Sequence, residues 1–295
     1  MNERRGHMGG HTETEIADQP TCWRRAAAED TSALPRPGER VAVLGCGTSW
    51  FMAQAYAALR ETAGQGETDA FTASEAPLHR AYDRVLVLTR SGTTTEILDA
   101  LAALRGRVPT VAITADAASP VRDAADDVVV LGYADERSVV QTRYATTQLV
   151  LLRAHLGEDV TAAIDDARRA LDAPTPAPAG QYTFLGQGWT TGLAHEAALK
   201  MREAAGAWTE SYPATEYRHG PISIAAPGRV VWSFGPPPAG LAEQVAAAGA
   251  TLVAGTLDPL AELVRVQRHA VELARAAGLD PDAPRNLTRS VILDA

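Results

Sequence analysis

The stretch RVLVLTRSGTTTEILDALAALRG, residues 84–106, joins an apolar run to an apolar-periodic segment through a turn rich in hydroxyl groups. The run at 84–88 is typical of a buried strand, and ILDALAALRG has the apolar spacing of a helix. Residues 88–97, which cover the turn, contain five Ser and Thr residues, one Gly and one Arg. The order strand, polar turn, helix predicts one unit of an α/β fold.

The hydroxyl-rich turn has two interpretations. Ser and Thr are common helix N-caps, so the turn could simply begin a helix. Alternatively, hydroxyl groups, an Arg and the N–H groups of a helix N-terminus together suit an anion such as phosphate. The rest of the chain has to distinguish the two.

The same alternation continues on both sides of this stretch. Short β-branched runs predict strands, and apolar runs separated by helices indicate a parallel sheet that is covered on both faces. The expected strands are 40–47, 84–88, 108–114 and 126–131, and the expected helices are 49–63, 94–105, 142–157 and 159–172.

The pattern restarts after APTPAPAG, residues 173–180, which we interpret as a linker because its prolines cannot continue a helix. YTFLGQGW at 182–189 repeats the strand and Gly-x-Gly exit of VAVLGCGTSW, and later runs at 228–235 and 250–255 are expected strands. We therefore predict an α/β protein made by tandem duplication. The expected parts are a leader and helix at 1–34, a first domain at 35–172, the linker, and a second domain at 181–295.

The two copies differ after their second strand. The second copy has SFGPPPAG, residues 233–240, where the first has LTRSGTTTE. Three prolines remove three backbone donors, so we expect only the first copy to keep an anion site. This asymmetry favours the anion-site interpretation of the turn.

Composition narrows the class of protein. With 46% hydrophobic and 21% charged residues, the chain is typical of a soluble globular protein. A net charge of −9 without a basic run argues against nucleic acid as a partner, and no apolar stretch is long enough to cross a membrane. Residues 1–15 lack the apolar core of a secretory signal and are expected to be a disordered leader, with translation starting at Met1 or Met8. We expect a cytoplasmic protein.

Two further ligand classes are disfavoured. Cys22 and Cys46 fit no metal or disulfide spacing, and we expect no metal and no cofactor. GCGTSW at 45–50 resembles the start of a dinucleotide fingerprint, but Trp50 stands where a third Gly is needed for close helix packing. A tight turn explains the two glycines, and Ser49 adds a hydroxyl at the carboxyl end of a strand, where ligands of parallel sheets bind.

The second copy begins with the helix HEAALKMREAAGAW, residues 195–208. Glu196, Lys200 and Glu203 fall at i, i+4 and i+7 and therefore share one face. Such a face is commonly solvated. Against this interpretation, the Ala, Leu and Met residues around it leave little of the helix that is obviously polar surface. The segment 209–221 has no clear helix or strand pattern and contains His219, which is a candidate for proton transfer because it follows a helix that carries carboxylates.

Five motifs together resemble the double sugar-isomerase (SIS) domain family. They resemble in particular the isomerase half of glucosamine-6-phosphate synthase and the stand-alone amino-sugar-phosphate deaminases and isomerases. The resemblance runs from about residue 40 to residue 293 and implies two tandem SIS units, each a flavodoxin-like parallel sheet flanked by helices. The motifs are GCGTS, LTRSGTTTE, EAALKMRE, YPATEYRHGP and DPDAPRNLTRSV.

The resemblance also implies roles for individual residues. Glu203 would be the base that moves a proton between C1 and C2 of the sugar, His219 would assist ring opening, and Lys200 would support the base or the open-chain hydroxyls. A homodimer is implied, because the family's histidine loop commonly serves the neighbouring subunit. The substrate phosphate would be held by Ser49, Thr89, Arg90, Ser91 and Thr94. The remaining substrate-site residues are expected to be Gly47, Thr48, Val139, Glu196 and Arg289.

Three departures from the family bear on the activity. No glutaminase domain precedes residue 40, so we expect no use of glutamine as an ammonia source. Arg289 stands where the family has a lysine near the reacting carbonyl, and an arginine cannot form a Schiff base. Arg90 replaces the glutamine of the synthase, as in the deaminase and isomerase branch.

The sequence thus predicts a phosphosugar aldose–ketose isomerase coupled to deamination of an amino-sugar 6-phosphate, which yields a ketose 6-phosphate and ammonia. Two alternatives stay open, a simple isomerase without amine loss and a non-catalytic phosphosugar sensor. Two observations argue against the sensor. Sensors of this type usually carry a basic DNA-binding domain, whereas this chain is acidic and has no basic run, and a sensor needs neither Glu203 nor His219.

Overall fold

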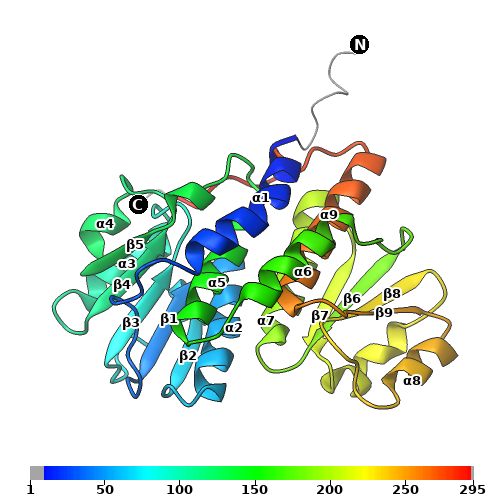
Figure 1. The fold of residues 1–295 in the computed structure, drawn as a ribbon, viewed down its shortest axis with the longest axis horizontal. Coiled ribbons are helices and arrows are strands. Elements are labelled where there is room, and N and C mark those ends of the chain that lie inside the picture. The colour runs from blue at the N-terminus through cyan, green and yellow to red at the C-terminus, as the bar shows by residue number, and fades with distance from the viewer. Residues whose placement is uncertain (1–9, 294–295) are drawn as a thin grey trace, which may run out of the picture. The chain divides into compact units, whose positions relative to one another are not determined.

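A computed structural model describes residues 10–293 and shows two compact units, each built from separate stretches of the chain. The first unit comprises Thr21–Glu136, Arg143–Val160 and residues 288–293. The second unit comprises residues 10–20, Arg137–Thr142 and Thr161–Leu287. Each unit contains one parallel sheet with helices against it (Figure 1).

The first unit is built on a five-stranded parallel sheet of strand order β2-β1-β3-β4-β5. Adjacent strands are in parallel register, with Leu44 of β1 opposite Val87 of β3. The strands are β1 (Val41–Gly45), β2 (Thr68–Thr72), β3 (Arg84–Leu88), β4 (Thr110–Thr114) and β5 (Asp127–Val130). The helices are α2 (Thr48–Thr62), α3 (Thr95–Leu104), α4 (Val121–Ala124) and α5 (Arg143–His155), with short 3-10 turns at Ala73–Glu75 (η2) and Gly132–Ala134 (η3).

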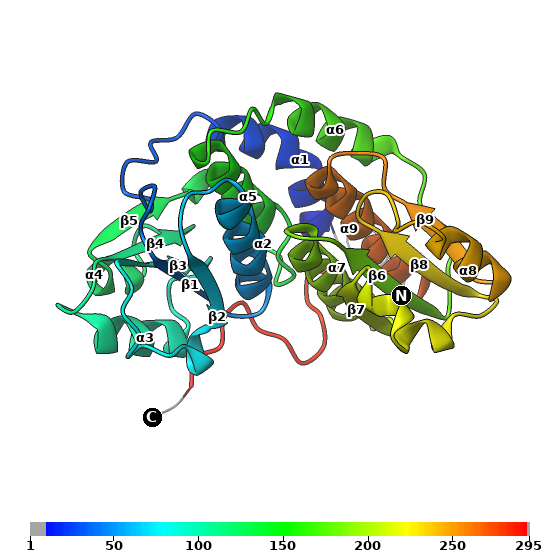
Figure 2. The ribbon, with the colours of Figure 1, turned by 90° about the horizontal axis from the view of Figure 1, so that it is seen from below.

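Helices cover both faces of this sheet, which explains why β1 and β4 are buried along their whole length (Figure 2). On one face, Val85 and Val87 pack with Ile97 and Leu101 of α3 in a single apolar cluster. Helices α2 and α5 pack against each other, and Tyr144 of α5 is fully buried. A sheet covered on both sides favours continuous apolar strands, as the sequence indicates.

The second unit is built on a four-stranded parallel sheet of strand order β7-β6-β8-β9. The order matches that of β2-β1-β3-β4 in the first unit. In both sheets the strand that comes first in the chain lies between the second and the third, and the fourth follows the third. The strands are β6 (Gln181–Gly186), β7 (Thr209–Pro213), β8 (Arg229–Ser233) and β9 (Thr251–Ala254). The helices are α6 (Thr161–Asp172), α7 (Thr190–Ala205), α8 (Leu241–Ala247) and α9 (Pro259–Ala276), with 3-10 turns at Glu216–Arg218 (η4) and Pro221–Ile224 (η5).

The prediction of parallel sheets flanked by helices is confirmed. The two sheets share a strand order, but the tandem duplication and the expected domain boundaries stay predictions. Gly45 and Gly186 occupy matching places at the ends of β1 and β6. A Cβ at Gly45 would lie 2.5 Å from the Ser49 main chain, and one at Gly186 would overlap the Thr190 main chain. Only glycine permits each helix to approach its strand so closely.

Two expectations about the chain's elements are wrong, and one strand was not predicted. Residues 10–15, expected within a disordered leader, form the start of helix α1 (Gly10–Ala26), while residues 1–9 lie outside the described residues. The segment 209–221, expected to be irregular, begins with strand β7. Strand β2 was not expected. β2 and β7 are edge strands of which only the first residue is fully buried, so neither has the apolar run that marks the central strands.

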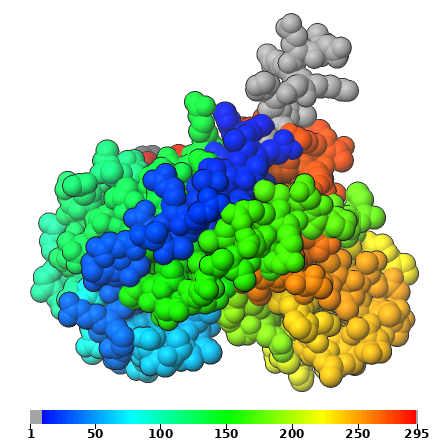
Figure 3. Space-filling model, in the orientation of Figure 1, coloured from blue at the N-terminus to red at the C-terminus, as the bar shows by residue number. Residues whose placement is uncertain are grey.

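Helix α9 packs against both α6 and α7 within the second unit. The buried side of α6 is formed largely by Ala163, Ile164, Ala167 and Ala170, and the helix lies at the surface in the view of Figure 3. Among residues 10–293, no helix has the length and apolar character needed to cross a membrane.

Candidate active site

The hydroxyl loop, Thr89–Thr94, connects β3 to α3 and is largely buried. Thr89 and Ser91 are 3% and 9% exposed. The Thr89 hydroxyl accepts a hydrogen bond from the Gly92 N–H (3.2 Å), and the Ser91 hydroxyl accepts one from the Thr93 N–H (3.3 Å). A hydroxyl that accepts in this way still has its own proton to donate, so both side chains can donate to an anion.

Gly92 allows the hydroxyl loop to turn sharply. Its φ is +64°, and a Cβ at this position would overlap the Ser119 side chain. The Gly92 carbonyl accepts a hydrogen bond from the Val121 N–H (3.1 Å), and the Arg90 carbonyl accepts one from the Ala115 N–H (3.0 Å). The main chain of the loop is therefore fixed on both sides by neighbouring turns.

Tyr144, which the sequence analysis did not identify, supports the start of the loop from α5. Its hydroxyl donates to the carbonyl of Ile113 (2.9 Å), and the Thr89 N–H donates to the same carbonyl (3.0 Å). Burial raises the pKa of Tyr144 well above its ordinary value, so the phenol stays a neutral donor. A tyrosine near the start of a helix gives no such indication in the sequence.

The glycine turn after β1 lies at the same edge of the sheet. Thr48 and Ser49 are both 4% exposed at the start of α2, and Gly47 has a φ of +55°. Since β1 and β3 are adjacent and parallel, their carboxyl ends lie side by side. Burial raises the pKa of the Cys46 thiol, so the turn carries no thiolate. The structure thus gathers at one edge of the first sheet the predicted phosphate residues and two of their neighbours, namely Gly47, Thr48, Ser49, Thr89, Arg90, Ser91 and Thr94.

Arg90 is held by a buried carboxylate. Its Nη1 lies 3.5 Å from Glu136 Oε2, and the two side chains are 1% and 0% exposed. Its Nη2 donates to the carbonyl of Arg289 (2.9 Å). Glu136 also accepts a hydrogen bond from the Arg143 N–H (2.8 Å). Because Glu136 offsets the charge of Arg90, direct pairing of this arginine with a phosphate stays a prediction.

Arg289 is attached within the first unit through two neighbouring residues, Asp135 and Glu136. Its guanidinium donates to the Glu136 carbonyl and pairs with the Asp135 carboxylate. The next residue, Ser290, lies 3.0 Å from Thr93, hydroxyl to hydroxyl. Arg289 is therefore attached beside the hydroxyl loop, and its expected place near a reacting carbonyl stays untested. The sequence analysis identified neither Asp135 nor Glu136.

Helix α7 carries the predicted acid–base residues in the second unit. Glu196 and Lys200 are 0% and 1% exposed, so this face of the helix is not solvated. Lys200 Nζ lies 3.4 Å from Glu196 Oε1 and also pairs with Glu203. One ammonium group thus lies between two carboxylates, of which only Glu203 is partly accessible, at 18% of its side chain.

Glu203 lines a cavity of about 370 Å³ within the second unit. The cavity lies between the end of α7 and the segment after α9 that contains the DPDAPRNL motif. A carboxylate at a cavity wall, held by a buried lysine, can accept and return a proton on a bound molecule. The lining residues are Arg202, Glu203, Ala204, Gly206, Gly278, Leu279, Asp280, Ala283, Pro284, Arg285 and Asn286.

Val139 contacts, through its main chain, the segment 278–286 that contributes to the lining of this cavity. Its N–H donates to the carbonyl of Asp282 (3.3 Å), and the Asp282 carboxylate accepts from the N–H groups of His11 (3.1 Å) and Thr12 (2.7 Å) at the start of α1. His219 is exposed and follows η4. Within residues 10–293, no hydrogen bond or ion pair of its side chain links it to Lys200 or Glu203, so the structure does not bring these residues into contact.

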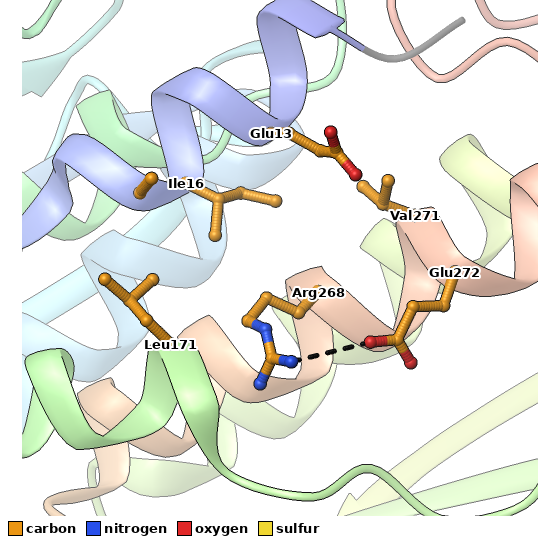
Figure 4. A pocket seen from close by; sticks show the side chains of 7 residues that line it. Glu13, Ile16, Leu171, Arg268, Val271 and Glu272 are labelled. Carbon is orange, nitrogen blue, oxygen red and sulfur yellow. Dashed lines mark ion pairs between the residues drawn. The ribbon is translucent and has the colours of Figure 1, made fainter.

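A second cavity of about 270 Å³ lies between α1, α6 and α9 (Figure 4). It shares no lining residue with the Glu203 cavity. Its charged groups are paired, because Arg268 lies 3.6 Å from Glu272 and Glu13 pairs with Arg275. In the described part of the chain, no group of three or more His, Cys, Asp and Glu residues is arranged to hold a metal.

Residues 36–156 match the family model of the SIS domain, so the chain contains a SIS domain. Glutamine–fructose-6-phosphate aminotransferase (isomerizing) from Aeropyrum pernix is 31% identical over 267 residues, which cover 71% of this chain and 43% of that protein. The chain spans about half the length of the curated relatives it matches. It is homologous to the isomerase domain of these enzymes.

Two solved structures show the same fold. Glucosamine-6-phosphate deaminase from Thermotoga maritima has a TM-score of 0.81 at 23% identity, covering 95% of this chain and 99% of that chain. Tagatose-6-phosphate ketose/aldose isomerase from Escherichia coli has a TM-score of 0.77 at 19% identity, covering 95% of each chain. The shared fold spans both units, whereas the family model covers the first sheet and its helices.

Proposed function

We propose that this protein converts an amino-sugar 6-phosphate and water into a ketose 6-phosphate and ammonia. Glu203 removes the proton from C2 of the open-chain aldose and returns it to C1. The C1 carbonyl oxygen gains a proton while the amine nitrogen loses one, so that C1 becomes a hydroxymethyl group and the C2–N bond becomes an imine. Water adds to this imine, the C–N bond breaks, and the carbon is left as the ketone while ammonia departs. Isomerisation and deamination then share one proton-transfer step.

The partly exposed carboxylate of Glu203 in its cavity is the observation that carries this proposal. A base for proton transfer between adjacent carbons must reach the substrate, and Glu203 alone of the three charged groups on this face of α7 does so. The buried Lys200 pairs with this carboxylate and holds it at the cavity wall. The buried Glu196 in turn compensates the charge of Lys200. A protein that only binds a sugar phosphate has no need for this arrangement.

The hydroxyl loop supports phosphate as the anchor of the substrate. Thr89, Ser91 and Ser49 present hydroxyl groups at the carboxyl edge of a parallel sheet, where ligands of this class of sheet bind. One short piece of sequence contributes to both sets of groups, since Arg285 lines the Glu203 cavity and Ser290 contacts the hydroxyl loop. We assign both sets to one substrate as part of this proposal.

The first experiment measures ammonia and ketose 6-phosphate formed from glucosamine 6-phosphate and galactosamine 6-phosphate. Glu203→Gln is expected to lower kcat by about 10²- to 10⁴-fold, because the amide cannot accept the proton. Glu243→Gln, an exposed carboxylate on α8, is the matched control and is expected to leave kcat unchanged. Normal turnover by Glu203→Gln would overturn the assignment of the base.

The same panel separates the two alternatives. A simple isomerase would interconvert aldose and ketose 6-phosphates, which the panel also includes, and would release no ammonia. A sensor would bind a sugar phosphate, detected as a rise in Tm, without converting any of them. Either result would contradict the proposed deamination.

We further propose a homodimer in which His219 opens the sugar ring at the partner's site. The exposure of His219 and its lack of contact with Glu203 among the described residues support this assignment. Mixing inactive Glu203→Gln and His219→Ala proteins, with exchange of subunits, is expected to restore about a quarter of wild-type activity, because half of the dimers then contain one intact site. A mixture that stays inactive would place both residues in a single subunit's site.

A further inference from the structure

Residues Thr288–Leu293, called the strap, lie along the hydroxyl loop and the first turn of α3 within the first unit (Figure 2). The Arg289 carbonyl accepts from Arg90 (2.9 Å), and the Val291 carbonyl accepts from the Thr95 N–H (3.3 Å). In the opposite direction, the Leu293 N–H donates to the Thr95 hydroxyl (2.9 Å). The strap therefore follows the loop through main-chain contacts.

Apolar burial does little to hold the strap. Val291, Ile292 and Leu293 are 52%, 67% and 55% exposed. The side chain that attaches it is Arg289, through the Asp135 carboxylate and the Glu136 carbonyl. Two neighbouring acidic residues thus each hold one arginine, since Glu136 holds Arg90 of the loop and Asp135 holds Arg289 of the strap.

We propose that Asp135 and Arg289 form a clamp that keeps the strap on the hydroxyl loop, and that this clamp raises the affinity of the loop for phosphate. The inference rests on the proposed phosphate binding by the loop. Both residues act as positioning residues, because the strap fixes Thr93 and Thr95 while the hydroxyls of Thr89 and Ser91 keep their protons for an anion. A loop that is ordered before binding loses less entropy when the anion arrives.

The test measures the Kd of inorganic phosphate by calorimetry for the full chain and four variants. Asp135→Asn and Arg289→Ala are each expected to weaken binding about three- to fivefold, as for a half-exposed ion pair. The double variant is expected to be no weaker than either single variant, because each removes the same clamp. Arg289→Lys, which can still reach Asp135, should recover part of the affinity.

Arg107→Ala is the matched charge control. Arg107 is exposed and lies just beyond the far end of α3, about 15 Å of helix away from the loop. If losing one positive charge anywhere weakens phosphate binding, Arg107→Ala will have the same effect as Arg289→Ala, and the clamp is refuted. Equal affinity of wild type and Asp135→Asn, or tighter binding by Arg289→Ala, would refute it as well.

Hydrogen exchange separates the clamp from a purely structural role. Because coupling between two sites is reciprocal, saturating phosphate is expected to slow exchange of the Leu293 N–H in the wild type and to do so much less in Asp135→Asn. Unchanged protection in the wild type, although phosphate binds, would contradict the clamp while leaving the proposed function intact. If the wild type binds neither phosphate nor a sugar phosphate, the proposed function fails first.

Discussion

The two units each contain an ion pair whose side chains are 1% and 0% exposed, yet the pairs are built for different tasks. In the first unit, Arg90 and Glu136 are far apart in sequence and join the hydroxyl loop to the segment after η3. In the second unit, Lys200 and Glu196 are one helical turn apart on α7. The first pair fixes a loop, whereas the second presents a third group, Glu203, to a cavity.

The loops after β3 and β8, which follow corresponding strands of the two sheets, differ in the hydrogen-bond donors that they offer. The hydroxyl loop offers Thr89, Ser91 and Thr94, and its main chain turns at Gly92. The loop after β8 contains three consecutive prolines at 236–238, which have no N–H to donate. Sheets with a matching strand order therefore carry different chemistry at corresponding edges, which teaches that the fold does not determine the site.

Removing Lys200, the lysine of the second pair, is expected to have the largest effect on stability. Lys200→Met leaves the Glu196 carboxylate buried without its cation and is expected to lower the free energy of unfolding by about 3–5 kcal/mol. The measurement is urea denaturation followed by tryptophan fluorescence. The double variant Glu196→Gln/Lys200→Met should recover more than half of the loss, because the uncompensated charge is gone. A double variant as unstable as Lys200→Met would show that packing, not charge, dominates.

The central part of each sheet was predictable from the sequence, because strands covered on both faces require apolar runs such as those of β1, β3 and β8. The edge strands β2 (TDAFT) and β7 (TESYP) were not, since they lack an apolar run such as the one that marks the edge strand β5 (DVVV). A helix was expected within residues 1–34, but the first residues of α1 were assigned to the leader because they are polar and charged. They are fixed by distant groups such as Asp282, which accepts from the N–H of Thr12.

The local parts of the candidate site could be predicted from the sequence, whereas its long-range contacts could not. The hydroxyls of the loop and the spacing of Glu196, Lys200 and Glu203 are local patterns, and the structure keeps each set together. The partners of Arg90 and Arg289 are not local, because Glu136 and Asp135 are 46 and 154 residues away in the chain. Long-range pairing of this kind leaves no periodic pattern, so a single sequence cannot reveal it.

Substitution of one glycine in each of the two corresponding loops tests which loop is more tightly packed. Gly92→Ala is expected to lower the free energy of unfolding by about 2–4 kcal/mol, since a Cβ at a φ of +64° would also overlap Ser119. Gly235→Ala, in the proline loop, has a φ of +104° but no atom within 4 Å of the added Cβ, and is expected to cost about 1–2 kcal/mol. Urea denaturation of both variants gives the difference. Equal losses would mean that the hydroxyl loop is no more tightly packed than its counterpart.

The smallest expected effect concerns a single hydroxyl of the first unit. Thr89→Val keeps the shape of the side chain but removes a donor to phosphate, so the Kd of inorganic phosphate should rise about fivefold, the equivalent of one hydrogen bond. Thr89→Ser retains the hydroxyl and is expected to bind as the wild type does. Ser233→Ala, at the end of β8, removes a buried hydroxyl from the other unit and should leave the Kd unchanged. If Ser233→Ala weakens binding as much as Thr89→Val, the two edges do not differ in the way that their sequences indicate, and the assignment of phosphate to the hydroxyl loop loses its basis.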